Sequence, residues 1–231
     1  MSTSTLSRRC AAEGIGTAML LAAVVGSGIM GDRLAAGNVA VALLANTIAT
    51  GAALVALILT FGPISGAHFN PAVTVADASQ GGTRWSDVPT YIGAQIVGAF
   101  VGVFVAHLMF EEQVLQVSTH VRSGGSQVLS ECIATFGLLA VIWGCSRARS
   151  ESVPFGVGLY ITAAYWFTAS TSFANPVVTI ARAMTDTFAG IRPSDVPGFI
   201  VAQIAGAALA TLLFRWLLPP RPTQASGILP D

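Results

Sequence analysis

Six long apolar stretches constrain this chain more than any other feature of its sequence. A helix needs about 20 apolar residues to cross the ~30 Å hydrocarbon core of a membrane. The 231-residue chain holds six stretches near that length, at residues 10–31, 38–61, 88–110, 127–145, 153–173 and 196–218. The sequence therefore predicts an all-α integral membrane protein with six transmembrane helices.

The composition indicates a surface that is covered largely by lipid. Charged residues make up 10% of the chain and hydrophobic residues 53%, whereas soluble domains carry about 25% charged residues. The formal net charge is zero and the eleven basic residues, all of them arginine, form no basic stripe, so we expect no nucleic-acid partner. The three cysteines stand far apart with no histidine nearby, and we expect neither a metal site nor a cofactor.

Two further apolar segments are too short to cross a membrane. They cover residues 70–80 and 175–188, and at a rise of ~1.5 Å per residue each reaches ~15 Å, half of the bilayer. The first begins with Asn70 and Pro71, the second with Asn175 and Pro176. Asparagine caps helix N-termini, and proline is favoured at the first helical position. We therefore predict two half-helices.

The chain repeats itself in three places, always in the same order. FNPAVTVADA at 69–78 matches ANPVVTIARA at 174–183, AEGIGTAMLL at 12–21 resembles SECIATFGLL at 130–139, and IGAQIVGA at 92–99 matches IVAQIAGA at 200–207. Repeat 1 covers about residues 9–111 and repeat 2 about 127–218. Because each repeat holds three spans, an odd number, the second enters the membrane from the opposite side. We expect a single membrane domain over 1–231, with half-helices that meet at its centre and a disordered tail at 219–231.

The positions of the arginines predict the orientation in the membrane. With the N-terminus inside, seven arginines fall in inner segments and four in outer segments, and positive residues favour the cytoplasmic side. Arg8 and Arg9 precede the first stretch, which contains Glu13 and no small-residue cleavage site, so we expect a span and not a signal peptide. We predict a multi-pass protein of the cell inner (plasma) membrane with both termini in the cytoplasm.

The runs that lead into the half-helices, residues 62–69 and 170–174, are predicted to be irregular. Irregular backbone at membrane depth is tolerated only inside protein or along a wet cavity. The amides of Asn70 and Asn175 would point into that cavity, and two half-helix N-termini would place partial positive charge at one point. A cation or a hopping proton meets a barrier there, whereas a neutral solute does not. The pattern favours a passive channel for small uncharged solutes.

The string SGAHFNPAV at 65–73, its partner ANPVV and the paired glutamates resemble the aquaporin or major intrinsic protein family. The resemblance extends over about residues 9–218. It implies a right-handed bundle of six helices and two half-helices, a homotetramer with one pore per subunit, and a lipid bilayer and small neutral solutes as partners. The second motif departs from the family's Asn-Pro-Ala-Arg, because Val177 and Val178 replace the last two residues. The motif positions are Asn70, Pro71, Ala72, Asn175, Pro176 and Val177.

The resemblance also implies a narrow filter built from four positions. Three of them fall on Thr50, Ser172 and Val178. The fourth falls on Ala163 or on Tyr165, depending on how the fifth span is aligned with the family. Water-selective members use histidine and arginine here, with bulky aromatic packing, so we expect the filter of this chain to be wider and uncharged.

The missing filter arginine bears on the choice of solute. A wide, uncharged filter favours glycerol-like polyols and hydroxylated metalloids over strict selectivity for water. The chain resembles the bacterial aquaglyceroporin-like branch without this arginine, which is associated with arsenite and methylated arsenicals. Two alternatives stay open: Arg182, seven residues after Asn175, fills the vacant space, or the pore is an ordinary water pore with a modified filter.

Several polar residues are expected at membrane depth, where ionisable groups are costly and usually functional. For Glu13 and Glu131 we expect a structural role as acceptors of hydrogen bonds from the irregular runs, with a proton relay as the alternative. We expect His68 to line the pore wall, with gating as the alternative. Ion pairs between loops and spans are expected for Asp77, Arg182 and Asp186, and hydrogen bonds between helices for Gln95 and Gln203.

The sequence carries no recognisable catalytic motif, so we predict no enzymatic activity and no catalytic residue. One rival is an inverted-repeat secondary transporter, which would need a titratable site at mid-membrane and would respond to a proton gradient. The other is an intramembrane enzyme that uses Glu13 and Glu131 as acids.

Overall fold

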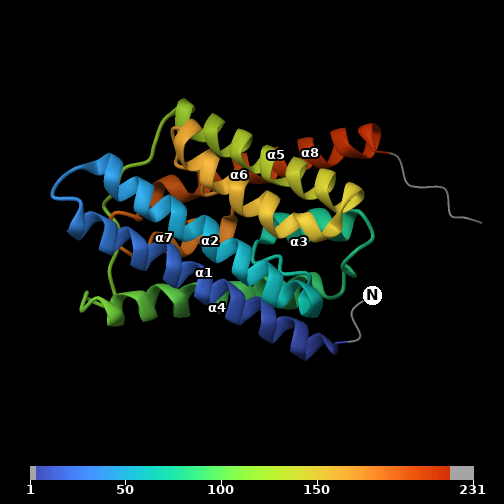
Figure 1. The fold of residues 1–231 in the computed structure, drawn as a ribbon, viewed down its shortest axis with the longest axis horizontal. Coiled ribbons are helices and arrows are strands. Elements are labelled where there is room, and N and C mark those ends of the chain that lie inside the picture. Colours follow the sequence, from blue (N-terminus) through green and yellow to red (C-terminus); the bar gives the residue numbers. More distant parts are fainter. Residues whose placement is uncertain (1–3, 219–231) are drawn as a thin grey trace, which may run out of the picture.

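The computed structural model describes residues 4–218, and all regular structure in that part of the chain is helical. The predicted disordered tail at 219–231 lies outside the described residues. Figure 1 shows long helices that run side by side, with two short ones, α3 and α7, toward opposite ends of the bundle. The helices are α1 (Leu6–Leu34), α2 (Val39–Ser65), α3 (Pro71–Ser79), α4 (Val88–Met109), α5 (Gly125–Ala148), α6 (Val153–Phe167), α7 (Pro176–Arg182) and α8 (Val196–Leu217), with 3₁₀ turns at Ser150–Ser152 and Pro193–Asp195.

Five of these helices, α1, α2, α4, α5 and α8, are long and apolar enough to cross a membrane. The sixth, α6, has 15 residues and reaches ~22 Å. The predicted span 153–173 is therefore wrong at its end. The helix ends at Phe167, and Thr168 is extended, with φ −108° and ψ 138°. The following residues form the irregular run that leads to α7.

The two half-helices are present, and their asparagines cap them as predicted. Asn70 accepts a hydrogen bond from the backbone N–H of Ala72, and Asn175 accepts two, from Val177 and Val178. The first prediction, 70–80, agrees with α3, but the second, 175–188, is too long because α7 ends at Arg182. The predicted irregular run 62–69 is shorter than expected, since α2 continues as far as Ser65.

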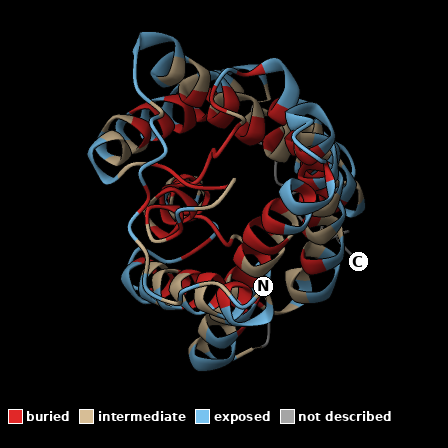
Figure 2. Ribbon diagram, turned by 90° about the vertical axis from the view of Figure 1, so that its left-hand side faces the viewer, coloured by how far each residue is buried: buried red, intermediate tan, exposed pale blue. Residues whose placement is uncertain are grey.

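The two repeats interlock. Helix α1 packs against α2 and α4, α5 packs against α6 and α8, and α2 meets α6 across the boundary between the repeats. Each half-helix also packs against a long helix of the other repeat, since α3 contacts α8 and α7 contacts α4. The buried residues lie on the inside of this ring of helices, around the two half-helices (Figure 2).

The outside of the bundle is apolar. Large hydrophobic side chains such as Leu108, Leu159 and Val201 are exposed on the long helices, Leu159 by 70%. An exposed apolar surface of this kind marks contact with a membrane or a partner. Together with the five membrane-length helices, it identifies a multi-pass membrane protein.

Glycines bring the helices close together at equivalent places in the two repeats. A Cβ atom on Gly98 would lie 2.1 Å from the carbonyl oxygen of Gly14, and one on Gly206 would lie 2.2 Å from that of Cys132. Gly98 lies where α4 packs against α1, and Gly206 lies where α8 packs against α5. Small residues at helix crossings allow such backbone contact in membrane proteins. The contacts fix the long helices around the central half-helices.

Candidate channel and its lining

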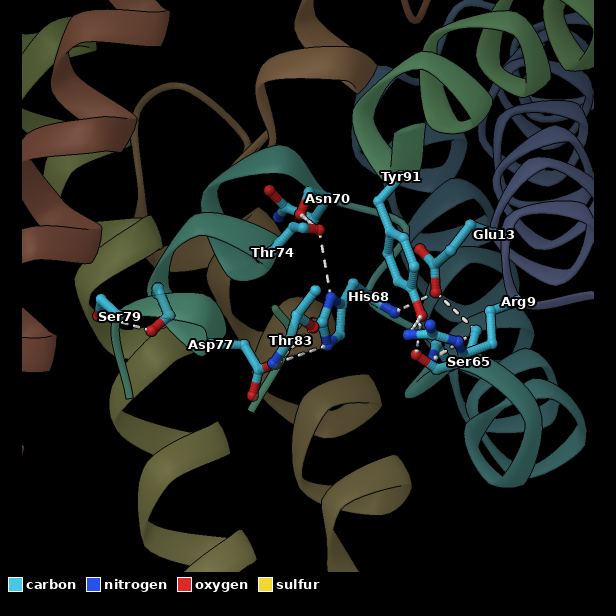
Figure 3. A network of polar contacts seen from close by, with 12 residues as sticks. Arg9, Glu13, Ser65, His68, Asn70, Thr74, Asp77, Ser79, Thr83 and Tyr91 are labelled. Carbon is cyan, nitrogen blue, oxygen red and sulfur yellow. Dashed lines mark hydrogen bonds and ion pairs between the residues drawn. The ribbon is translucent and has the colours of Figure 1, made fainter. Parts of the chain in front are cut away.

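Glu13 of α1 holds the irregular run in front of α3. It is fully buried, and its carboxylate accepts hydrogen bonds from the hydroxyl of Ser65 at 2.6 Å and from the backbone N–H groups of His68 at 2.9 Å and Phe69 at 2.7 Å. The side-chain amide of Gln95 on α4 donates a fourth, at 2.9 Å. An ionised carboxylate is an acceptor only, and here it satisfies backbone donors that have no helical partner (Figure 3).

Glu131 does the same for the run in front of α7. Also fully buried, it accepts hydrogen bonds from the backbone N–H groups of Phe173 at 2.8 Å and Ala174 at 2.9 Å, and from the amide of Gln203 at 2.6 Å. Gln95 and Gln203 bridge helices as expected. The carboxylate oxygens of both glutamates accept hydrogen bonds from neighbouring donors, and neither residue lines the cavity described below. This geometry favours the structural role over a proton relay.

The two runs held by these glutamates have an unusual backbone. Ala67 and Phe69 in the first, and Thr171, Ser172 and Ala174 in the second, have positive φ values between 47° and 58°. A non-glycine residue in this left-handed region carries strain of order 1–3 kcal/mol, and such residues cluster at functional sites. These backbone dihedral angles turn the chain sharply into each half-helix.

At the centre, the two asparagines cross-link the two runs. The side-chain Nδ2 of Asn70 donates to the carbonyl oxygen of Ala174 at 2.8 Å, and that of Asn175 donates to the carbonyl oxygen of Phe69, also at 2.8 Å. An asparagine amide carries two N–H donors. Since Oδ1 caps the half-helix and one N–H crosses to the other run, a second N–H on each asparagine is left to face the cavity, which both residues line.

One cavity of about 320 Å³ runs along the inside of the bundle and past both asparagines. A water molecule occupies ~30 Å³ in the liquid, so several waters or a small polyol have room. The lining comes from both repeats. It extends from Trp143 and Val153, on the side of α3, to Tyr165 and Val178, on the side of α7.

Four residues assigned to the filter lie together on the α7 side of the cavity. Thr50, Tyr165, Ser172 and Val178 all line it, and each is at most 5% exposed. The Tyr165 hydroxyl donates to Oγ1 of Thr50 at 3.3 Å. Ala163 is exposed on the other face of α6 and does not line the cavity, so of the two alignments the one with Tyr165 fits this fold.

The second motif keeps its geometry in spite of its two valines. Val177 is buried and packs in the apolar core, while its backbone N–H still donates to Oδ1 of Asn175 at 3.1 Å. Ala72 is buried at the equivalent place in the first motif. Pro71 and Pro176 occupy the first position of their half-helices. A valine side chain at either position therefore leaves the cap intact, because the backbone supplies the donors.

His68 lies on the α3 side of the cavity. Its Nδ1 is 3.2 Å from Oγ1 of Thr74, and its Nε2 is 3.7 Å from a carboxylate oxygen of Asp77. Its ring also packs against that of Tyr91, with centroids 5.7 Å apart (Figure 3). Both His68 and Asp77 line the cavity. The contact of Asp77 with His68 is an ion pair only when the imidazole is protonated, and it does not reach a span as predicted; the carboxylate instead accepts hydrogen bonds from the backbone N–H and the hydroxyl of Thr83, both at 2.7 Å.

The predicted ion pairs of Arg182 and Asp186 are wrong within the described part of the chain. Arg182 is 2% exposed and lines the cavity without a carboxylate within ion-pair distance among residues 4–218. Asp186 instead accepts hydrogen bonds from the backbone N–H and the hydroxyl of Thr119, at 2.7 and 3.0 Å. It therefore fastens one loop to another by hydrogen bonds. Arg182 therefore adds a charged group to the cavity lining on the α7 side, where an uncharged lining was expected.

Some lining residues were not predicted from the sequence. Phe173 and Trp143 line the cavity, and Trp143 donates from its indole nitrogen to Oγ1 of Thr211 at 3.3 Å. Phe173 could have been found from its place between Ser172 and Asn175. Nothing in the sequence around Trp143 separates a pore-facing position from a lipid-facing one, since only the rotation of α5 decides between them.

Comparisons with known proteins agree with this architecture. The family model for the major intrinsic protein matches residues 1–153. Aquaglyceroporin AqpS of Rhizobium meliloti is 57% identical over 93% of this chain and 92% of its own length. A probable glycerol uptake facilitator protein of Thermotoga maritima is 31% identical over 74% of this chain and 82% of its own.

A solved structure shares the fold. The X-ray structure of the aquaglyceroporin from Plasmodium falciparum superposes with a TM-score of 0.69, covering 92% of this chain and 95% of the other, at 20% sequence identity. At that identity the match speaks for the fold alone, the inverted bundle of six helices and two half-helices. With the family model over residues 1–153 and the relative at 57% identity, this chain belongs to the major intrinsic protein family.

Proposed function

We propose that this chain is a passive membrane channel for water and small uncharged solutes such as glycerol, and that it excludes ions and protons. The observation that carries the proposal is the cavity that passes both half-helices and both asparagines, lined from the two repeats. Relatives named as an aquaglyceroporin and as a probable glycerol uptake facilitator support glycerol as a solute. Exclusion of cations by converging half-helix dipoles is a general property of aquaporins.

The proposed filter consists of Thr50, Tyr165, Ser172 and Val178. Valine is short and apolar, so solutes wider than water have room beside it. Arsenite and methylated arsenicals, which are small neutral hydroxylated molecules, belong to the same proposal. A strictly water-selective pore is the alternative, and a secondary transporter or an enzyme would need a reactive group that the buried glutamates do not offer, because their oxygens are occupied by neighbouring donors.

For the cellular setting we propose the inner membrane, with both termini in the cytoplasm and α7 on the outer side. The arginine distribution along the sequence supports this orientation. We also propose a homotetramer with one pore in each subunit. Exposed apolar side chains on the long helices are available both for lipid and for neighbouring subunits.

The test is a solute panel on purified protein in liposomes, comparing the wild type with Val178→Arg. We expect the wild type to pass water, glycerol and arsenite. The substitution places a long charged side chain into the cavity, so glycerol and arsenite permeation should fall by about tenfold or more, a barrier increase of ~1.4 kcal/mol, while water permeation falls less.

Val178→Leu is the matched control, since it adds bulk without charge. Equal loss of all solutes in Val178→Arg would mean that Val178 does not line the filter. A wild type that passes water but neither glycerol nor arsenite would leave the strictly water-selective pore as the function.

A further inference from the structure

Arg182 is a buried cation without a counter-charge. It lies at the last position of α7, is 2% exposed and lines the cavity. Among the described residues 4–218, no carboxylate lies within 4.0 Å of it. An ionisable residue at membrane depth is costly and marks a functional position, and removal of a charge from water without a partner is costlier still.

The position of Arg182 on α7 directs its side chain toward the filter. It follows Val178 by four residues, so both lie on the same face of the helix. Side chains in a helix tilt toward its N-terminus, and the N-terminus of α7 is at the crossed asparagines. Arg182 therefore reaches back from the end of the half-helix toward the level of Val178, whose short side chain leaves the space open.

The contacts of Arg182 hold its guanidinium in place but satisfy only one of its N–H donors among the described residues. The group lies over the ring of Phe173, 3.4 Å from the centroid, and its Nε donates to the carbonyl oxygen of Ala189. Its two terminal nitrogens make no hydrogen bond with any described residue. An arginine carries five N–H donors, so four of them are left without a protein partner among the described residues, on a side chain that lines the cavity.

Ser172 supplies a second, independent sign of a binding site at this level. Ser172 is a lining residue of the cavity, and its buried hydroxyl has no hydrogen-bond partner among the described residues. A buried hydroxyl without a partner costs free energy unless water or a solute satisfies it. Arg182 and Ser172 therefore bring hydrogen-bonding groups without a protein partner among residues 4–218 to the part of the cavity wall that also holds the Thr50–Tyr165 pair.

We propose that Arg182 is a specificity-determining residue of the pore. It restores, one helical turn farther along α7, the fixed positive charge and the hydrogen-bond donors that Val178 lacks. Together with Ser172 it binds the hydroxyl or carbonyl oxygens of passing neutral solutes and repels cations. The inference rests on the proposed channel function, and it replaces the expectation of an uncharged filter with a wide and cationic one.

The experiment compares urea with the guanidinium ion in liposomes that carry the wild type, Arg182→Met, Arg182→Gln or Arg182→Lys. The two solutes share size and planar shape, but guanidinium keeps its charge at any accessible pH, so no neutral form confounds its flux. We expect the wild type to pass urea and exclude guanidinium. Arg182→Met and Arg182→Gln should raise the guanidinium-to-urea permeability ratio by about tenfold or more, because the repulsion between unit charges in a poorly polarisable medium is lost.

The conservative variants separate charge from hydrogen bonding. Arg182→Lys should keep guanidinium out, and Arg182→Gln should keep more of the glycerol permeability than Arg182→Met. Arg122→Met is the matched control, since Arg122 lies over the same ring, 5.0 Å from the centroid of Phe173, but donates to the carbonyls of Gly190 and Ser170 and does not line the cavity. It should lower stability and change the permeability ratio by less than about twofold.

The outcomes separate the two proposals. If the wild type passes urea and glycerol, and both Arg182→Met and Arg182→Gln assemble but leave the ratio unchanged, the inference is overturned and the channel function stands. A ratio that rises as much in Arg122→Met as in Arg182→Met also overturns it. A wild type that passes neither neutral solute overturns the channel function, and the inference falls with it.

Discussion

At the residue scale, the two buried glutamates show how much of the site depends on single acceptors. Glu13 and Glu131 each accept hydrogen bonds from the backbone of one strained run, so we expect the sharp turns into α3 and α7 to depend on these carboxylates. The sequence predicted this role from the place of both glutamates in apolar spans and from the family resemblance, with a proton relay as the alternative. It did not predict which atoms would meet, because the donors come from residues 42–56 positions away along the chain.

Glu13→Gln should destabilise the channel. An amide replaces one acceptor oxygen by a donor, which then faces another donor, and a hydrogen bond to a charged group contributes about 1.5–3 kcal/mol. We expect a lower melting temperature in detergent and a reduced water permeability. The exposed Glu151→Gln is the control and should change neither. A Glu13→Gln protein of normal stability that has lost transport would favour the proton relay instead.

Asp186 gives a pH dependence to the loops on the α7 side. The hydrogen bonds from the backbone and the hydroxyl of Thr119 lower the pKa of this carboxyl below its ordinary value. A depressed pKa in the folded state stabilises the fold above the pKa of the unfolded chain, and this contribution is lost as the pH falls through the folded value.

Asp186→Asn should therefore cost a little stability at pH 7 and progressively less as the pH falls through the lowered pKa of the folded carboxyl. The effect is small because Asp186 is exposed to solvent, where screening weakens such contacts. Thermal melts of the two proteins across this range, together with hydrogen exchange at the amide of Thr119, measure it. A stability difference that stays constant down to the lowest pH would contradict the assignment.

At the element scale, helix crossings decide how the bundle closes around the half-helices. α1 crosses α4 at Gly98, and α5 crosses α8 at Gly206, with no space for a Cβ atom at either place. Both glycines were visible in the matching strings of the repeats. The sequence did not show which glycines lie at a helix crossing, because small residues recur along every span.

Gly98→Ala should weaken the α1–α4 crossing. The added Cβ would lie 2.1 Å from a backbone carbonyl, so the two helices must move apart, and overpacking of this kind costs about 1–3 kcal/mol. The control lies on the same helix, since a Cβ on Gly93 meets nothing within 4 Å. Gly93→Ala should be neutral or stabilising, because alanine favours helix. Thermal stability in detergent distinguishes the two, and equal effects would mean that the crossing is not tight.

At the scale of the whole molecule, the two repeats together form the walls of one cavity. Neither repeat encloses the cavity alone, since residues of both repeats line it. The crossed asparagine hydrogen bonds link the two runs and connect residues 104 and 106 positions apart. Since these bonds fasten the two repeats to each other at the cavity, we expect access to both sides without a change between two conformations.

Solute flux should therefore be linear in concentration and independent of a proton gradient. Liposomes loaded at different internal pH, with and without a protonophore, measure glycerol uptake under both conditions. Empty liposomes give the background. Uptake that accelerates with an inward proton gradient, or that saturates sharply, would favour the secondary transporter.

The sequence by itself determined the membrane class, the inverted repeat, the caps of both half-helices and the role of the paired glutamates, because hydropathy, capping and repetition are written locally. Only the tertiary structure decided that Tyr165 and not Ala163 faces the cavity, that α6 stops at Phe167, and that Arg182 turns into the cavity without an ion-pair partner among the described residues. These outcomes depend on the rotation of each helix about its own axis and on the reach of long side chains. Packing between distant segments sets both, and no local pattern encodes them.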